Sequence, residues 1–221
     1  MDRVKVKICG LTNVEDARIA VEAGADLLGF IFYPKSPRYV TPETVAAIIQ
    51  EIRDWRLESS LPKFVGVFVN ETPAQMKAIL ATTGLDYAQL HGNESTEMMA
   101  MLSGCAFKAI RPASAEAAQT GAAQFAELGL ADGPSILVDA YDPNLHGGTG
   151  KTADWQMAAA LARRYPGLLL AGSLTAENVA TAIQFVQPWG VDVSSGVEAA
   201  PGKKDHDKVR AFVAQAKGLC K

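Results

Sequence analysis

Short apolar runs alternate with longer amphipathic segments along the chain, and this alternation is the strongest signal in the sequence. The runs are rich in Val, Ile, Leu and Phe and recur about every 20 to 30 residues, a spacing typical of strand–helix units. They predict strands near residues 4–9, 26–32, 64–69, 86–90, 106–110, 135–139, 168–171 and 190–194. The segments between them predict helices near 13–23, 41–54, 73–82, 94–103, 115–128, 154–164, 175–186 and 205–217.

Local signals support several of the helix starts. Thr41 and Thr72 are each followed by proline, and a hydroxyl cap with proline in the first turn is typical of a helix N-terminus. Thr175, which has Asn178 three residues later, predicts the start of the seventh helix.

Strict alternation with nearly continuous apolar strands favours a parallel sheet covered by helices. A doubly wound open sheet competes with a closed barrel. An open sheet rarely has so many regular strand–helix units, and no Gly-rich dinucleotide fingerprint follows the first strand. We therefore expect residues 1–221 to form one TIM (β/α)8 barrel, with its active site at the C-terminal ends of the strands.

Composition and charge narrow the class of protein. The chain has 21 Lys and Arg against 24 Asp and Glu, so no broad basic face favours nucleic acid or anionic lipid. No apolar stretch approaches the length of a membrane helix, and the N-terminus resembles a strand, not a signal peptide. Three scattered cysteines suit neither a disulfide framework nor a zinc site. We expect a cytoplasmic protein, monomeric or homodimeric, with no metal, nucleic-acid or membrane partner.

Two residues at strand ends are candidates for acid–base chemistry. Cys9 shares a period-two face with Lys7, whose ammonium should lower the pKa of the thiol and favour thiolate. Asp139 closes an apolar strand, where burial should raise its pKa and leave it able to donate a proton. Each has a structural alternative, a small buried hydrophobe for Cys9 and a capping or loop carboxylate for Asp139. Cys105 and Cys220 are interpreted as structural.

Three more polar residues lie near strand ends. Arg38 follows the second strand in a loop stiffened by Pro34 and Pro37, which suits bidentate binding of a carboxylate, although a solvated surface arginine fits equally well. His91 ends the fourth strand and could orient a substrate or be structural. Lys108 raises the alternative of Schiff-base chemistry, or is an ordinary barrel lysine.

Two loops of small residues predict an anion site. They follow the seventh and eighth strands, where such turns expose backbone amides, and phosphate sites recur there in this fold. The residues are Gly172, Ser173, Ser194, Ser195 and Gly196. GGTGKT at 147–152 lacks the spacing of a nucleotide-binding loop, and we expect a flexible active-site loop instead.

Seven segments taken together resemble the phosphoribosylanthranilate isomerase family of tryptophan biosynthesis. In order from residue 5 to 198 they are KICGLT, KSPRYV, QLHG, ILVDA, GGTGKT, AGSLTAENV and DVSSGVE. The resemblance implies a TIM barrel and an Amadori rearrangement of N-(5'-phosphoribosyl)anthranilate to 1-(2-carboxyphenylamino)-1-deoxyribulose 5-phosphate, a phosphosugar–anthranilate substrate handled with no cofactor.

The resemblance also implies roles for the candidate residues. Asp139 is then the general acid that protonates the ring oxygen, Cys9 the base that removes the proton from the second sugar carbon, and Arg38 the anchor of the anthranilate carboxylate. The two Gly/Ser loops match the phosphate grip. The family usually has Gly-Gly where this chain has Gly172 and Ser173, which puts the phosphate contacts in doubt because serine tolerates positive φ less well.

Asp192 on the eighth strand completes the set of candidates. We expect Asp192, like His91, to bind the substrate. Because the eighth strand closes the barrel beside the first, we also expect a buried Lys7–Asp192 ion pair beneath the Cys9 thiol.

Other readings are less well supported. A ribulose-phosphate epimerase would need metal-binding His and Asp on several strands, but His91 is alone at a strand end among three histidines. An indoleglycerol-phosphate synthase would need a Lys and Glu pair that we do not find. A non-catalytic phosphate sensor would be expected to lack Cys9 or Asp139. Acceptance of a related aminoimidazole carboxamide ribotide stays open.

Overall fold

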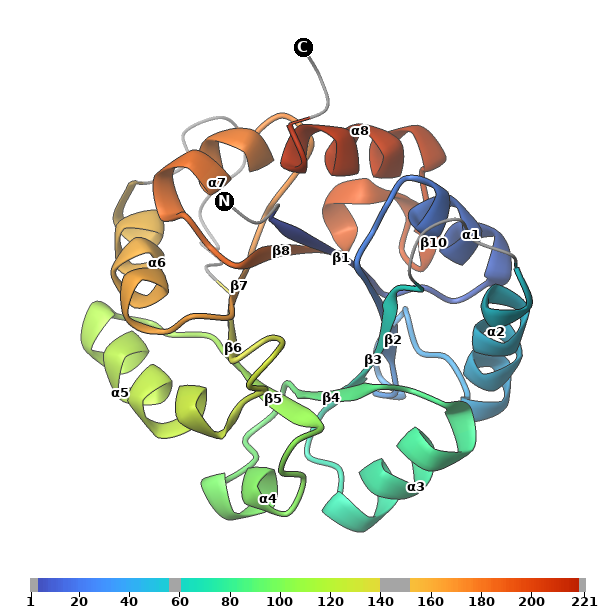
Figure 1. The fold of residues 1–221 in the computed structure, drawn as a ribbon, viewed down its shortest axis with the longest axis horizontal. Coiled ribbons are helices and arrows are strands. Elements are labelled where there is room, and N and C mark those ends of the chain that lie inside the picture. Colours follow the sequence, from blue (N-terminus) through green and yellow to red (C-terminus); the bar gives the residue numbers. More distant parts are fainter. Residues whose placement is uncertain (1–3, 56–60, 140–151, 219–221) are drawn as a thin grey trace.

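A computed structural model describes residues 4–55, 61–139 and 152–218, with side chains left undescribed at 152–154. Eight parallel strands close into a barrel in chain order, β1 to β8, and the helices form a ring around it (Figure 1). Each barrel strand and the helix that follows it were expected from the periodicity of apolar residues in the sequence. The predicted TIM barrel is confirmed.

The barrel strands are β1 (Lys5–Cys9), β2 (Leu27–Ile31), β3 (Lys63–Phe68), β4 (Tyr87–Leu90), β5 (Ala106–Ile110), β6 (Ile136–Asp139), β7 (Leu168–Ala171) and β8 (Gly190–Val193). The helices are α1 (Val14–Glu22), α2 (Pro42–Asp54), α3 (Pro73–Thr83), α4 (Thr96–Ala100), α5 (Ala115–Phe125), α6 (Thr152–Arg164), α7 (Val179–Val186) and α8 (His206–Ala216). As predicted, Thr41 and Thr72 cap α2 and α3 by accepting hydrogen bonds from the backbone amides of Thr44 and Gln75.

The structure differs from the predicted elements in four places. The helix predicted at 94–103 spans only Thr96–Ala100, and the helix predicted at 115–128 ends at Phe125 and is followed by the 3-10 helix η1 (Ala126–Leu128). α7 begins at Val179, four residues after Thr175, and the turn before it has the Thr175 amide donating to Asn178 Oδ1 at 2.8 Å and the Val179 amide donating to the Thr175 carbonyl at 3.0 Å. After β8 the chain forms short elements that the sequence did not predict. They are η2 (Ser195–Val197), β9 (Glu198–Ala200) and β10 (Lys203–Lys204).

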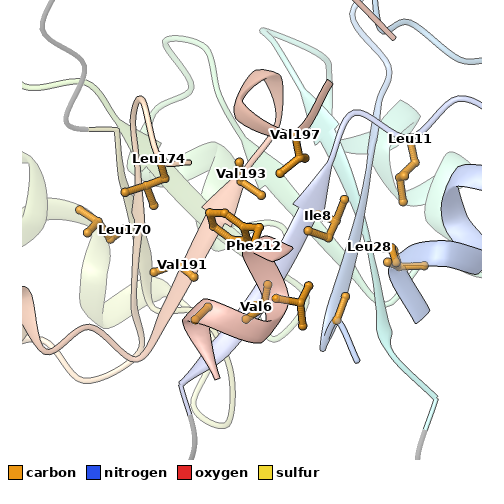
Figure 2. Close-up of a cluster of buried hydrophobic side chains, with 14 of the residues drawn as sticks. Val6, Ile8, Leu11, Leu28, Leu170, Leu174, Val191, Val193, Val197 and Phe212 are labelled. Carbon is orange, nitrogen blue, oxygen red and sulfur yellow. The ribbon is translucent and has the colours of Figure 1, made fainter. Parts of the chain in front are cut away.

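Alternate strand residues face opposite sides of the barrel wall. Val6 and Ile8 point outward and pack with Val191 and Val193 against Phe212 of α8, and all of these side chains are buried (Figure 2). Burying a side chain such as Phe212 contributes about 1.5–3 kcal/mol to the free energy of unfolding. This outer layer fixes β8 beside β1, which brings the two strands' inward residues together.

The inward residues change character along the strands. Leu27, Val65, Phe107, Leu137 and Leu169 fill the barrel with a second apolar cluster. Farther along the same face lie polar residues such as Gln89, Asp139 and Asp192, and the fully buried Lys7 lies level with Leu27. The interior is therefore a packed apolar plug with a polar layer toward the C-terminal strand ends.

Candidate active site

A cavity of about 350 Å³ opens at the C-terminal ends of the strands. It is lined by all ten residues to which the sequence analysis assigned catalysis, substrate binding or phosphate binding: Cys9, Arg38, His91, Asp139, Gly172, Ser173, Asp192, Ser194, Ser195 and Gly196. A second cavity of about 360 Å³ lies near Lys5, Lys63 and Trp189, at the other end of the strands, and contains none of them. The nominated residues therefore share one site.

Beneath the Cys9 thiol lies the predicted ion pair. Lys7 is opposite Asp192 in the β1–β8 register, and its Nζ donates to Asp192 Oδ1 at 3.0 Å and to Gln89 Oε1 at 2.8 Å. Burial alone would lower the pKa of Lys7, but the Asp192 carboxylate and Cys9 outweigh it and hold that pKa above its usual value. Lys7 is thus a permanent cation under the site.

The predicted acidity of the Cys9 thiol is wrong in direction. Burial, which leaves Cys9 only 5% exposed, raises the pKa of the thiol, and the charges of Lys7 and Lys204 oppose that rise without cancelling it. Asp192 adds to the rise. Strand periodicity located the Lys7 ammonium correctly, but it could not predict that desolvation of the Cys9 thiol would outweigh the effect of this charge on the pKa.

Gly29 makes room for the sulfur. It pairs with Cys9 across β1 and β2, and a Cβ at position 29 would lie 2.8 Å from Cys9 Sγ, closer than real Cβ contacts allow. The thiol therefore occupies space that any larger residue on β2 would take.

Asp139 lies beside two side chains that directly follow β5 and β4. Arg111 donates from Nε to Asp139 Oδ2 at 3.2 Å and also donates to His91 Nε2. Burial raises the pKa of Asp139 as predicted, while Arg111 opposes the rise. Burial, aided by Arg111, lowers the pKa of His91 to about 3, so this imidazole is neutral and its 4.0 Å approach to Asp139 is not an ion pair.

Arg38 is not a solvated surface arginine. Its side chain is 21% exposed, it lines the cavity, and it forms two hydrogen bonds of 2.7 Å with Glu198, from Nε to Oε1 and from Nη2 to Oε2. The guanidinium is therefore held in one orientation at the cavity wall.

The two Gly/Ser loops pack against each other. A Cβ on Gly196 would lie 2.0 Å from the Leu174 carbonyl oxygen, so only glycine fits at this contact. Ser173 has φ of +48°, the left-handed conformation that prompted doubt, and Asn178 stabilises it by donating to the Ser173 carbonyl at 3.0 Å. Small residues and a supporting amide thus bring the β7 and β8 loops to one edge of the cavity.

Comparisons with known proteins agree on one family. The sequence model described as N-(5'-phosphoribosyl)anthranilate (PRA) isomerase matches residues 6–215. The chain is 46% identical over 217 residues to the N-(5'-phosphoribosyl)anthranilate isomerase of Pelobacter propionicus, covering 97% of this chain and 96% of that one. The chain belongs to the phosphoribosylanthranilate isomerase family.

Solved structures of phosphoribosylanthranilate isomerases have the same fold. The crystal structure of the enzyme from Thermotoga maritima has a TM-score of 0.85 and 42% identity, and the match covers 98% of this chain and all of that one. A phosphoribosyl anthranilate isomerase in complex with reduced 1-(o-carboxyphenylamino)-1-deoxyribulose 5-phosphate has a TM-score of 0.82 and 39% identity, and the match covers 98% of this chain and 100% of that one.

The sequence prediction missed two cavity residues of this phosphoribosylanthranilate isomerase family member, Arg111 and Gln89, and also Glu198, which binds the cavity residue Arg38. Arg111 directly follows β5, so the strand-end rule that selected His91 and Asp139 could have found it. Gln89 is an inward polar residue two positions before His91. Glu198 gave no signal, because its contact with Arg38 spans 160 residues of sequence.

Other sequence features have different outcomes. The Lys108 ammonium contacts Glu94 Oε2 at 3.0 Å and three backbone carbonyls, including that of Gly92 at 2.7 Å, which makes it a structural clamp and not a free amine. Residues 147–151 of the GGTGKT segment and Cys220 lie outside the described residues. In the described ranges no group of three or more His, Cys, Asp and Glu could hold a metal ion, and no helix is long and apolar enough to cross a membrane.

Proposed function

We propose that Cys9 and Asp139 are the base and the acid with which this chain carries out the reaction of its family. That reaction is the Amadori rearrangement of N-(5'-phosphoribosyl)anthranilate to 1-(2-carboxyphenylamino)-1-deoxyribulose 5-phosphate in tryptophan biosynthesis. The observation that carries the assignment is a carboxyl group of raised pKa and a thiol above a buried ammonium, both facing one cavity.

The proposed steps follow from these two groups. Asp139 gives its proton to the ring oxygen as the bond from that oxygen to the first sugar carbon breaks, which leaves an open-chain iminium ion. Cys9, as thiolate, then takes the proton from the second carbon, and the electron pair of that C–H bond neutralises the iminium. The resulting enolamine tautomerises to the ketose. Each proton transfer typically contributes about 10²–10⁴-fold to the rate.

The two anionic ends of the substrate need separate anchors in the cavity. The Arg38 guanidinium is suited to the anthranilate carboxylate, because planar guanidinium and carboxylate groups match. The loops at Gly172–Ser173 and Ser194–Gly196 are suited to the phosphate, since small residues let its oxygens approach the backbone amides. We assign the orientation of the sugar hydroxyls to the neutral His91 and to Asp192, which is paired with Lys7.

Substrate carrying deuterium at the second sugar carbon tests the proposed base. We expect a primary isotope effect on kcat for the wild type, and a loss of about 100-fold or more in kcat for Cys9→Ala and for Asp139→Asn. Cys105→Ser is the matched control, since that thiol is elsewhere and donates to the Leu102 carbonyl. Near-wild-type turnover in Cys9→Ala or Asp139→Asn would remove that residue from the mechanism.

The assembly and location of the protein are also proposals. Structures similar to this chain include monomers generated from the dimeric phosphoribosylantranilate isomerase of Thermotoga maritima, with a TM-score of 0.81 and 40% identity over 98% of this chain and all of that one. We expect residues 1–221 to act as one barrel domain in the cytoplasm, as a monomer or a homodimer. Sedimentation equilibrium distinguishes the two states.

A further inference from the structure

We propose that Glu198 is a positioning residue that holds Arg38 side-on and reserves the outer edge of its guanidinium for the substrate carboxylate. This inference rests on the proposed anchoring role of Arg38. It adds a residue to the site and a reason why the anchor selects a planar carboxylate.

The hydrogen-bond geometry of Arg38 leaves that edge available. A guanidinium has five N–H donors. Glu198 takes one from Nε and one from Nη2, both at 2.7 Å, which is the side-on mode of pairing. The remaining donors on Nη1 and Nη2 form the end-on edge, and that edge can bind a second carboxylate through two parallel hydrogen bonds. The two modes do not compete because they use different N–H donors, and Arg38 lines the cavity.

Glu198 is itself fixed from behind. Its side chain is 5% exposed, and the fully buried Lys204 donates from Nζ to Glu198 Oε1 at 3.0 Å and to the Ser194 carbonyl at 3.1 Å. The β9–β10 register places Lys204 opposite Glu198. The carboxylate therefore cannot turn without breaking a buried ion pair.

The charges in this cluster also point to an anionic ligand. Arg38 and Lys204 are two cations, and they share the single carboxylate of Glu198. Burial alone would raise the pKa of Glu198, but the hydrogen bonds from these cations hold it below its usual value. Burial lowers the pKa of Lys204, and Glu198 opposes that change. The cluster thus pairs two basic side chains with one carboxylate, which leaves the Arg38 guanidinium at the cavity wall to be neutralised by an incoming carboxylate.

Small residues support the stem of Arg38 in the same position. A Cβ on Gly10 would lie 2.7 Å from Arg38 Cδ and 2.9 Å from Ser194 Oγ, and the φ of Gly10 is +74°. A Cβ on Gly202 would lie 3.0 Å from the carbonyl oxygen of Pro37. Since the side chain is already packed in place, little rotamer entropy is lost when substrate binds.

The test measures the kinetics of the Glu198→Gln variant with two substrates. One is N-(5'-phosphoribosyl)anthranilate, and the other is N-(5'-phosphoribosyl)aniline, which differs from it only in lacking the carboxylate. We expect KM for the anthranilate substrate to rise about tenfold with little change in kcat, because a charge-assisted pair is lost. KM for the aniline substrate should not change. In an Arg38→Met background, Glu198→Gln should have no further effect on either constant. Glu116→Gln, an exposed change on α5, is the matched control.

Three results would overturn the inference. An equal rise in KM for both substrates would make Glu198 structural only. A fall in KM would make it a competitor of the substrate for Arg38. A full effect of Glu198→Gln in the Arg38→Met background would show that Glu198 does not act through Arg38.

If Arg38→Met alone leaves both KM values unchanged, it is the proposed anchoring role of Arg38 that fails. Should Glu198→Gln not fold, Glu198→Gln with Lys204→Met removes the unpaired ammonium and repeats the comparison.

Discussion

Replacing Lys7 by methionine removes the positive charge that lies under the Cys9 thiol. Burial already raises the pKa of Cys9, and Lys7 opposes that rise, so the variant raises this pKa further. The pKa of Asp139 is also raised by burial, but from the much lower value of a carboxyl group. Where the pH lies between these two pKa values, the free enzyme holds mostly thiol and carboxylate. The reactive form, thiolate with carboxylic acid, has the same number of protons and is a minor species.

The magnitude follows from this distribution. Between the two pKa values, the fraction of reactive enzyme depends on their difference, so kcat/KM falls about tenfold for each unit by which the pKa of Cys9 rises. An opposite charge in contact has a large effect, and we expect Lys7→Met to lower the plateau of kcat/KM by about 10- to 1,000-fold. The basic limb of the profile, set by Cys9, should move to higher pH, while the acidic limb, set by Asp139, stays.

The assay is the pH dependence of kcat/KM, with the ultraviolet absorbance of the thiolate read in a Cys105→Ser, Cys220→Ser background. Breaking a buried ion pair costs about 3–5 kcal/mol, so chemical denaturation must accompany the kinetics. Lys7→Met with Asp192→Asn is the control. It should recover stability, and the pKa of Cys9, read from the thiolate absorbance, should rise less than in Lys7→Met, because Asp192 raises that pKa. An unchanged plateau and basic limb in stable Lys7→Met would refute the reasoning.

Three further variants test other parts of the site. Arg38→Ala should mainly raise KM, and an unchanged KM in initial-rate kinetics would rule out its anchoring role. Gly29→Ala should lower kcat by about 100-fold with an unchanged circular dichroism spectrum, since its Cβ would meet the Cys9 sulfur at 2.8 Å; wild-type kcat would mean that the thiol need not be placed accurately. Arg111→Met should raise the pKa of Asp139, so the acidic limb of the kcat/KM profile moves to higher pH; a limb that stays would show that Arg111 does not act on Asp139.

The sequence predicted what local periodicity controls. Alternating apolar runs were enough to expect the barrel, and the strand-end rule selected residues that line one cavity. Two-residue alternation and barrel closure also predicted the Lys7–Asp192 pair.

What the sequence could not predict depends on distant contacts and on desolvation. The pKa of Cys9 is decided by burial from surrounding strands, which no spacing along β1 reveals. Glu198 meets Arg38 through β9 and β10, short elements with no periodic signal.

The most direct test of the account is the fluorescence of N-(5'-phosphoribosyl)anthranilate after addition of the purified protein. We expect the signal to decay at a rate proportional to protein concentration, as 1-(2-carboxyphenylamino)-1-deoxyribulose 5-phosphate accumulates. With the variant Cys9→Ser, Asp139→Asn, the decay should fall to the rate without protein. Wild-type decay no faster than the blank, or rapid decay with the double variant, would contradict the account.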